Sequence, residues 1–266
     1  MLLTLAVNSI SALLNSRSRN NRALLEVPSM AIDQLQLRGL NIYASSLAGW
    51  SIEDLDELRD RADKAACPCL VLVDDAPLDF SKGEGKRYMD AVERTKRLAT
   101  AANRLGCSSL AVSLNGPDNE DAFEHTAAGV REAMTHIERL EMNVLLQPGA
   151  TGLTNDPDRL TDLIKRIGGF RIGSLPSFGH AAQTGDVIAT LRKLAPYAGA
   201  MHATVESFSK AGKHKGYDLA ECVQAIKAVG FSNTLAIEWV GKGDPAAGIE
   251  QARGILQTAI DDPLES

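Results

Sequence analysis

Four polar residues interrupt short apolar runs in the second half of the chain: Gln147, Ser177, His202 and Glu238. An amide, a hydroxyl, an imidazole and a carboxylate can together bind a hydroxyl-rich ligand, hold a metal ion or move a proton. A buried carboxylate is costly unless it is paired, bound to a metal or protonated, so Glu238 is the most informative of the four. The alternative for Glu238 is a pair with a Lys or Arg at the rim, and for His202 a satisfied core histidine.

The alternation of side chains along a strand indicates that these residues share one mouth. Residues two apart on a strand point to the same side. The faces that carry the four polar residues are Asn143/Leu145/Gln147, Gly173/Leu175/Ser177, Ala200/His202/Thr204 and Thr234/Ala236/Glu238. We therefore expect the imidazole of His202 and the carboxylate of Glu238 to face each other across a shared cavity.

The elements that would position these groups are short apolar runs alternating with amphipathic stretches. Eight runs are candidate strands: 3–7, 40–44, 69–75, 109–115, 143–147, 171–177, 200–205 and 234–239. Helical patterns lie between them, at 52–65, 86–105, 119–140, 157–167, 185–195, 218–229 and 245–260. Strand then helix, repeated about eight times, predicts a single-domain α/β protein over residues 1–266, a (β/α)8 TIM barrel whose functional residues end the strands.

Local signals support these boundaries. Asp156-Pro157 and Asp244-Pro245 each place a capping residue before a proline at the first helical position. Residues 8–39 are the least regular part, where Arg17–Asn21 are expected to form a polar loop and residues 22–37 a helix interrupted by Pro28.

Composition narrows the class of protein. The net charge is −6, which makes nucleic acid a poor partner. The apolar N-terminus is too short and too broken by polar residues to span a membrane, and it lacks the charged region of a signal peptide. The four cysteines are expected to be small buried residues in a reducing, cytoplasmic setting. The oligomeric state stays open, a homo-oligomer included.

The stretch from about 143 to 255 resembles the xylose isomerase-like barrels, the sugar phosphate isomerases/epimerases. Its landmarks are NVLLQPGATGLTNDPDRLTDLI, IGSLPSFGH, KLAPYAGAMHATV and, most specifically, IKAVGFSNTLAIEWVGKGDPAAGIEQA. The N-terminal half resembles the family only loosely. The resemblance implies a sugar or polyol ligand and one divalent metal, held by a Glu, an Asp, a His and a Glu that end four successive strands.

Carried over by position, the resemblance makes His202 and Glu238 metal ligands and Glu238 the catalytic base. Gln147 stands where the first Glu belongs, and Ser177 stands where the Asp belongs. His180 matches a histidine that some members use near the substrate. Gln147, Ser177 and His180 are therefore expected to bind substrate.

These departures change the chemistry that the site can perform. Losing two carboxylates leaves a set that would hold zinc weakly and magnesium or manganese poorly, so the divalent metal can be lost. Gln147 cannot accept a proton at neutral pH, which excludes a two-base epimerisation through positions 147 and 238. A one-base reaction by Glu238 remains open.

Other polar groups follow the strands. Asp74 and Asn115 are candidate ligand-binding residues, although a cap or turn role suits Asp74 equally well. Glu206 could replace a lost carboxylate or be a solvated loop charge.

Three functions are compatible with this fold: an isomerase/epimerase-like protein with an altered metal site, a non-catalytic barrel that binds a sugar-like ligand or a protein partner, and an apurinic-site endonuclease. The third needs histidines from early strands, and residues 1–124 contain none.

Overall fold

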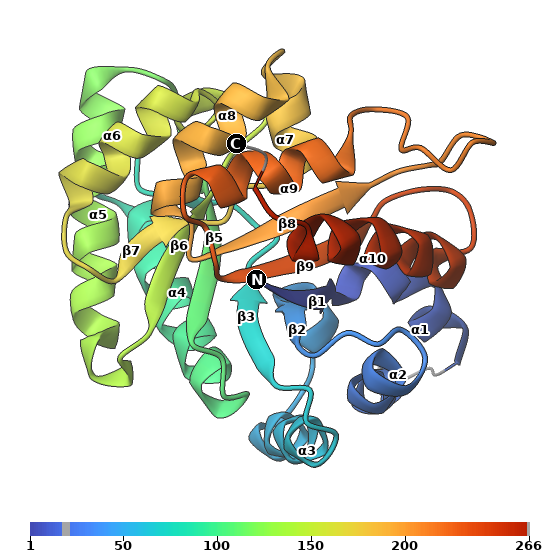
Figure 1. The fold of residues 1–266 in the computed structure, drawn as a ribbon. Coiled ribbons are helices and arrows are strands. Elements are labelled where there is room, and N and C mark those ends of the chain that lie inside the picture. The colour runs from blue at the N-terminus through green and yellow to red at the C-terminus, as the bar shows by residue number, and fades with distance from the viewer. Residues whose placement is uncertain (18–21, 265–266) are drawn as a thin grey trace.

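A ring of parallel strands surrounded by helices forms the centre of the molecule (Figure 1). The computed structural model describes residues 1–17 and 22–264. The strands are β1 (Leu2–Ala6), β2 (Leu40–Tyr43), β3 (Cys69–Val73), β4 (Leu78–Asp79), β5 (Ser109–Asn115), β6 (Asn143–Gln147), β7 (Ile172–Ser174), β8 (Ala200–Val205) and β9 (Thr234–Trp239). Their order is β7-β6-β5-β3-β2-β1-β9-β8, and the short β4 pairs with β5 outside this path.

Contacts between β7 and β8 close the ring. The amide of Gly199 donates to the carbonyl of Ser174, and the amide of His202 donates to that of Pro176. Ser177 and His202 form a parallel bridge at the same seam. The first and last long strands are neighbours, because β1 pairs with β9 in parallel. The predicted α/β barrel is therefore confirmed.

The helices follow the strands, as their caps predict. They are α1 (Ser11–Arg17), α2 (Val27–Asp33), α3 (Ile52–Lys64), α4 (Lys86–Arg104), α5 (Glu120–Ile137), α6 (Pro157–Ile167), α7 (Phe178–Gln183), α8 (Val187–Leu194), α9 (Leu219–Ala228) and α10 (Pro245–Asp261). Ser51 and Asp54 form a reciprocal capping box at the start of α3. Asp156 and Asp244 accept from backbone N–H groups, each before a proline in the first turn.

The N-terminal segment differs from expectation. Residues 7–10 form a 3-10 turn, η1, which continues directly into α1. A second 3-10 turn, η2 (Arg22–Glu26), precedes α2. Pro28 lies in the first turn of α2, where its missing N–H is not needed, so it begins a helix rather than interrupting one. Most of the expected polar loop at Arg17–Asn21 lies outside the described residues.

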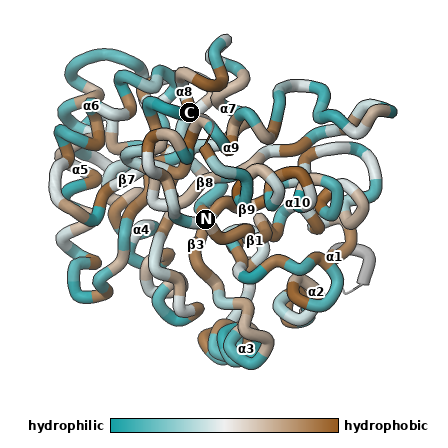
Figure 2. Tube along the Cα trace, viewed as in Figure 1, coloured by the Kyte–Doolittle hydropathy of each residue, from teal (hydrophilic) through white to brown (hydrophobic). Residues whose placement is uncertain are grey.

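Two apolar layers stabilise the barrel. The larger lies between strands and helices, and the smaller fills the inside of the ring with Val71, Val73, Ala111, Leu145, Leu175 and Ala200. In Figure 2 the central strands are mostly hydrophobic, while the outer helices alternate between hydrophobic and hydrophilic residues. All four cysteines are buried and free, as expected, and burial raises the pKa of the Cys67 thiol to about 11.

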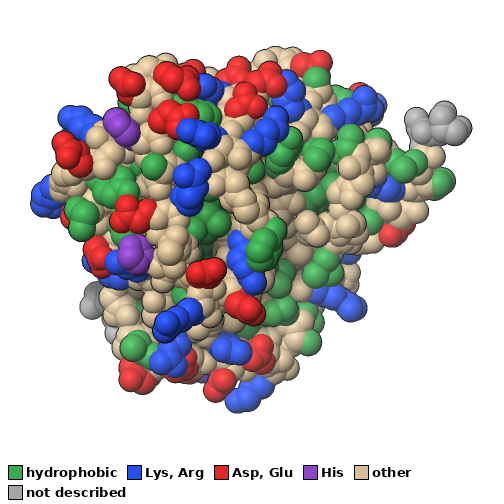
Figure 3. All heavy atoms as spheres, turned by 90° about the vertical axis from the view of Figure 1, so that its left-hand side faces the viewer, with side chains coloured by type: hydrophobic (Ala, Val, Ile, Leu, Met, Phe, Trp, Pro, Cys, Tyr) green, Lys and Arg blue, Asp and Glu red, His purple; other side chains and the backbone are tan. Residues whose placement is uncertain are grey.

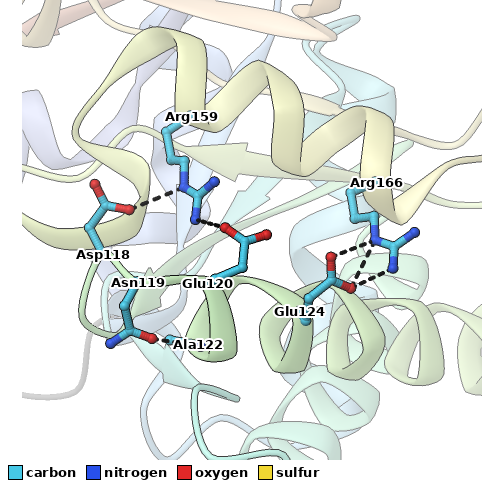
Figure 4. Close-up of polar contacts among 7 residues, drawn as sticks. All are labelled: Asp118, Asn119, Glu120, Ala122, Glu124, Arg159 and Arg166. Carbon is cyan, nitrogen blue, oxygen red and sulfur yellow. Dashed lines mark hydrogen bonds and ion pairs between the residues drawn. The ribbon is translucent and has the colours of Figure 1, made fainter.

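Ion pairs join neighbouring helices on the outside. Arg159 of α6 contacts Asp118 and Glu120, and Arg166 contacts Glu124 of α5 (Figure 4). Because these pairs are exposed and screened by water, they orient the helices more than they stabilise the fold. Both signs of charge are interspersed over the face shown in Figure 3. No helix among the described residues is both long and apolar enough to cross a bilayer.

Candidate functional site

His202 and Glu238 touch at the C-terminal end of the barrel. They lie on the neighbouring strands β8 and β9, where His202 pairs with Ala236 and Thr204 pairs with Glu238. The His202 Nδ1 atom is 3.5 Å from Glu238 Oε1, and the two side chains are 5% and 15% exposed. The two side chains lie next to each other at the strand ends, as the alternation predicted. They are in contact, however, and do not face each other across a cavity.

Glu238 has two further partners. The Tyr43 hydroxyl donates to Oε1 at 2.9 Å, and the Thr204 hydroxyl donates to Oε2 at 3.0 Å. Burial alone raises the pKa of Glu238, but the charge and hydrogen bond of His202, together with these two hydroxyls, outweigh burial and lower the pKa to about 2. The carboxylate is therefore held ionised at neutral pH. No rim lysine or arginine is among these partners.

The second strand contributes two residues that the sequence analysis did not select. Asn41 is completely buried, and its Nδ2 lies 3.0 Å from His202 Nε2. This contact orients the imidazole ring, whose Nδ1 lies on the side of Glu238. Tyr43 has its pKa raised by burial and by the nearby Glu238. The signal available in the sequence was the polar Asn and Tyr on one face of the run LNIY.

The side-chain amide of Gln147 bonds to the backbone of a neighbouring strand end. Its Nε2 donates to the carbonyl of Asp74 at 2.9 Å, across the end of β3. The carboxylate of Asp74 is fully buried and accepts from Arg94 at 2.5 Å and 2.8 Å and from the amide of Ala76. Asp74 thus stabilises the turn after β3, which is the alternative role that the sequence left open. Its carboxylate points toward α4, which carries Arg94.

The inward position after β3 belongs to Asp75. Val71 and Val73 belong to the inner layer, so residue 75 shares their side and Asp74 does not. Asp75 is exposed and close enough to Tyr43 to contribute to its raised pKa. Asn115 is exposed at the end of β5, opposite Asp79 of β4. The structure does not bring Asp74 or Asn115 into contact with Glu238.

Ser177 and His180 lie at the start of α7. The Ser177 hydroxyl accepts from the amide of His180 at 3.1 Å and so caps the helix. His180 is 8% exposed, and neither ring nitrogen has a well-formed hydrogen bond among the described residues. Burial lowers the pKa of His180 despite the nearby backbone of Gly149 and Asn155, so this imidazole is neutral. Its predicted contact with a ligand stays a prediction.

His214 holds the loop that follows β8 in place through hydrogen bonds to the loop's own backbone. His214 Nε2 accepts from the amide of Glu206, and Nδ1 lies 3.1 Å from the carbonyl of Tyr217. The Tyr217 hydroxyl in turn donates to the carbonyl of Thr204. The Glu206 side chain stays exposed, which fits a solvated loop charge better than a replacement for a lost carboxylate.

The donor set does not suit a hard divalent cation. Within residues 1–17 and 22–264, no group of three or more His, Cys, Asp or Glu side chains is placed to hold a metal. At the two positions where the resemblance implies carboxylates, Gln147 donates to a backbone carbonyl and Ser177 accepts from a helix amide. His202 and Glu238 satisfy each other. Magnesium and manganese need several anionic oxygens, which this site does not offer.

Comparison with known proteins places the chain in a family. The sequence model of the xylose isomerase-like TIM barrel family matches residues 31–259, and the chain belongs to that family. A search of curated proteins found no match. Among solved structures, L-ribulose 3-epimerase is similar, with 16% identity and a TM-score of 0.77 over 92% of this chain and 91% of that one.

Two further solved structures show the same fold. D-psicose 3-epimerase from Clostridium cellulolyticum H10, solved with D-tagatose, has 16% identity and a TM-score of 0.74 over 98% of this chain and 97% of that one. The IolI protein, solved with a zinc atom, has 14% identity and a TM-score of 0.73 over 98% of both chains. At these identities the likeness establishes the fold.

Proposed function

We propose that this protein is a sugar isomerase/epimerase-like barrel that binds a small sugar or polyol at its C-terminal mouth through an altered, metal-independent site. The observation that carries the proposal is the Glu238 carboxylate, held by contacts with His202, Tyr43 and Thr204 at the strand ends. A fixed carboxylate is a strong acceptor for ligand hydroxyl groups. The epimerase neighbours, one of them solved with a sugar, support this class of ligand.

The hydrogen bonds that Glu238 already accepts support binding without a metal ion. A carboxylate accepts hydrogen bonds at both oxygens and has about four lone-pair sites. Three of the sites on Glu238 are directed at protein groups, which leaves Oε2 free to accept one more bond. A ligand hydroxyl can take that place without a cation.

A one-base isomerase that uses Glu238 is the second candidate. A base works best with a pKa near the operating pH, and a carboxylate with a pKa of about 2 accepts protons weakly at pH 7. The carboxylate of Glu238 is therefore suited to binding and orienting a ligand more than to removing a proton from carbon.

The test combines calorimetry with isotope exchange. Aldoses, ketoses and polyols are titrated into wild type, Glu238→Gln and Glu206→Gln, with and without EDTA. The Glu206 variant is the matched control, because that carboxylate is exposed nearby. We expect Glu238→Gln to weaken binding at least tenfold, and Glu206→Gln and EDTA to change it less than twofold. Binding lost in EDTA and restored by zinc would refute metal independence, and no binding by any sugar would refute the function.

Deuterium exchange separates the two candidates. Each ligand that binds is incubated with the protein in D2O, and its C–H positions are followed by NMR. Exchange that disappears in Glu238→Gln would favour the one-base isomerase. Binding without exchange would support the binding protein.

A further inference from the structure

A cavity of about 250 Å³ lies beside the candidate site, between the N-terminal segment and the end of β2. Its lining residues are Val7, Asn8, Ser11, Leu14, Leu24, Tyr43, Ser45 and Ser46. Pockets for drug-sized ligands usually measure about 300–1,000 Å³, so this one suits a group of monosaccharide size or one end of a larger molecule.

The cavity shares a residue with the carboxylate site. Tyr43 lines the cavity and donates its hydroxyl to Glu238. The cavity wall is also anchored to the strand that carries Glu238. The Ser9 hydroxyl accepts from the amide of Trp239 at 2.9 Å and donates to the carbonyl of Ile237 at 3.3 Å. These bonds hold η1 against the strand that carries Glu238, so the cavity lies next to the carboxylate, with Tyr43 in contact with both.

The lining divides into an apolar and a polar part. Val7 and Leu24 are buried and Leu14 is half-buried, and together they offer a hydrocarbon wall without hydrogen-bonding groups. A ligand hydroxyl placed against that wall would lose its water without a replacement, whereas a methyl group would gain from burial.

Asn8 supplies an unused polar group beside that wall. Its Oδ1 is buried and has no hydrogen-bond partner among the described residues. A buried acceptor left in this way costs about 1–3 kcal/mol unless a ligand or water satisfies it. A half-turn of the amide exchanges its oxygen and nitrogen, so the side chain can meet a ligand group as donor or acceptor.

We propose that this cavity receives the methyl-bearing end of a deoxy sugar, with the apolar wall around the methyl group and Asn8 bonded to a neighbouring hydroxyl. The inference rests on the proposed function and narrows its ligand class from sugars in general to deoxy sugars. It makes Leu14 and Asn8 specificity residues, while Glu238 binds hydroxyls at the other end.

The test uses two sugars that differ in one atom. L-Fucose carries a methyl group where L-galactose carries a hydroxymethyl group, so their affinities measured by calorimetry isolate the effect of that end. We expect wild type to bind L-fucose roughly ten- to a hundredfold more tightly, since an apolar pocket discriminates against an added hydroxyl by up to about a hundredfold. Two variants alter the cavity, Leu14→Trp to fill it and Asn8→Leu to remove the amide. Met89→Trp adds a ring at an exposed position on α4 as the control.

In folded Leu14→Trp and Asn8→Leu, checked by near-UV circular dichroism, the preference for L-fucose should fall to about twofold or less, while Met89→Trp keeps it. Equal affinities in wild type, or a preference that survives in whichever cavity variant folds, would overturn the deoxy-sugar inference. The proposed function would still stand if other sugars bind and Glu238→Gln weakens them. If no sugar binds wild type, both fall.

Discussion

Replacing Tyr43 by Phe tests the polar cluster at its best-defined contact. The change removes one hydroxyl, 2.9 Å from Glu238 Oε1, and keeps the ring that packs on the inner layer. Hydrogen bonds to charged groups contribute about 1.5–3 kcal/mol, and Glu238 is only 15% exposed, so water replaces the hydroxyl poorly. We expect the free energy of unfolding to fall by about 2 kcal/mol in urea denaturation at pH 7.

Tyr88→Phe is the matched control. The Tyr88 hydroxyl also donates to a glutamate, Glu132, but that side chain is 48% exposed. Water can take the place of the lost hydroxyl there, so the loss should stay below about 1 kcal/mol. Equal losses in Tyr43→Phe and Tyr88→Phe would show that the Glu238 contact is not specially strong.

The pH dependence of the Tyr43→Phe effect has a definite sign. The folded-state pKa of Glu238 is lowered from 4.5 to about 2, so the unfolded chain binds the proton first as the pH falls. The stability that this group contributes is full above pH 4.5 and is lost as the pH falls toward 2. The gap between wild type and Tyr43→Phe should therefore narrow below pH 4.5. A gap that stays constant between pH 7 and pH 3 would refute the assignment of an ionised, hydroxyl-bonded Glu238.

Three further substitutions test the scaffold. Asp74→Asn removes the charge of the buried carboxylate that pairs with the partly exposed Arg94 and should cost about 1.5–3 kcal/mol by urea denaturation at pH 7, so a loss under 1 kcal/mol would contradict the pairing. Gly129→Ala in α5 would bring a methyl group to 2.5 Å from the Phe80 ring and should destabilise by about 1–3 kcal/mol despite the better helix propensity. Gly254→Ala in α10 meets nothing within 4 Å and should raise the melting temperature, and a rise for both alanines would show that Phe80 gives way.

Most of the fold could be predicted from the sequence because the signals that mark helix starts and strands are local. Asp-Pro pairs mark where α6 and α10 begin, and apolar runs mark the long strands. The short β4, the helix α1 and the six-residue α7 were missed, since none is long enough to show a period.

The site was predicted in part for the same reason. Strand alternation placed His202 and Glu238 together, as the structure has them. The same rule, applied from Val71 and Val73, would have selected Asp75 in place of Asp74. Tyr43 became recognisable only in the structure, where β1 pairs with both β2 and β9 and so brings these two strands close together. No local pattern contains this relation between residues far apart in the chain.

The position of Glu238 on the last strand affects how the protein is made. Its partners His202, Tyr43 and Thr204 come from earlier strands. Ser9, close to the start of the chain, bonds to the backbone of Ile237 and Trp239 close to its end. During synthesis, β1 can pair with β2 early, but its other neighbour, β9, is available only when almost the whole chain has left the ribosome. The polar centre is thus assembled last, and a chain cut short before β9 would expose an apolar strand edge that favours aggregation.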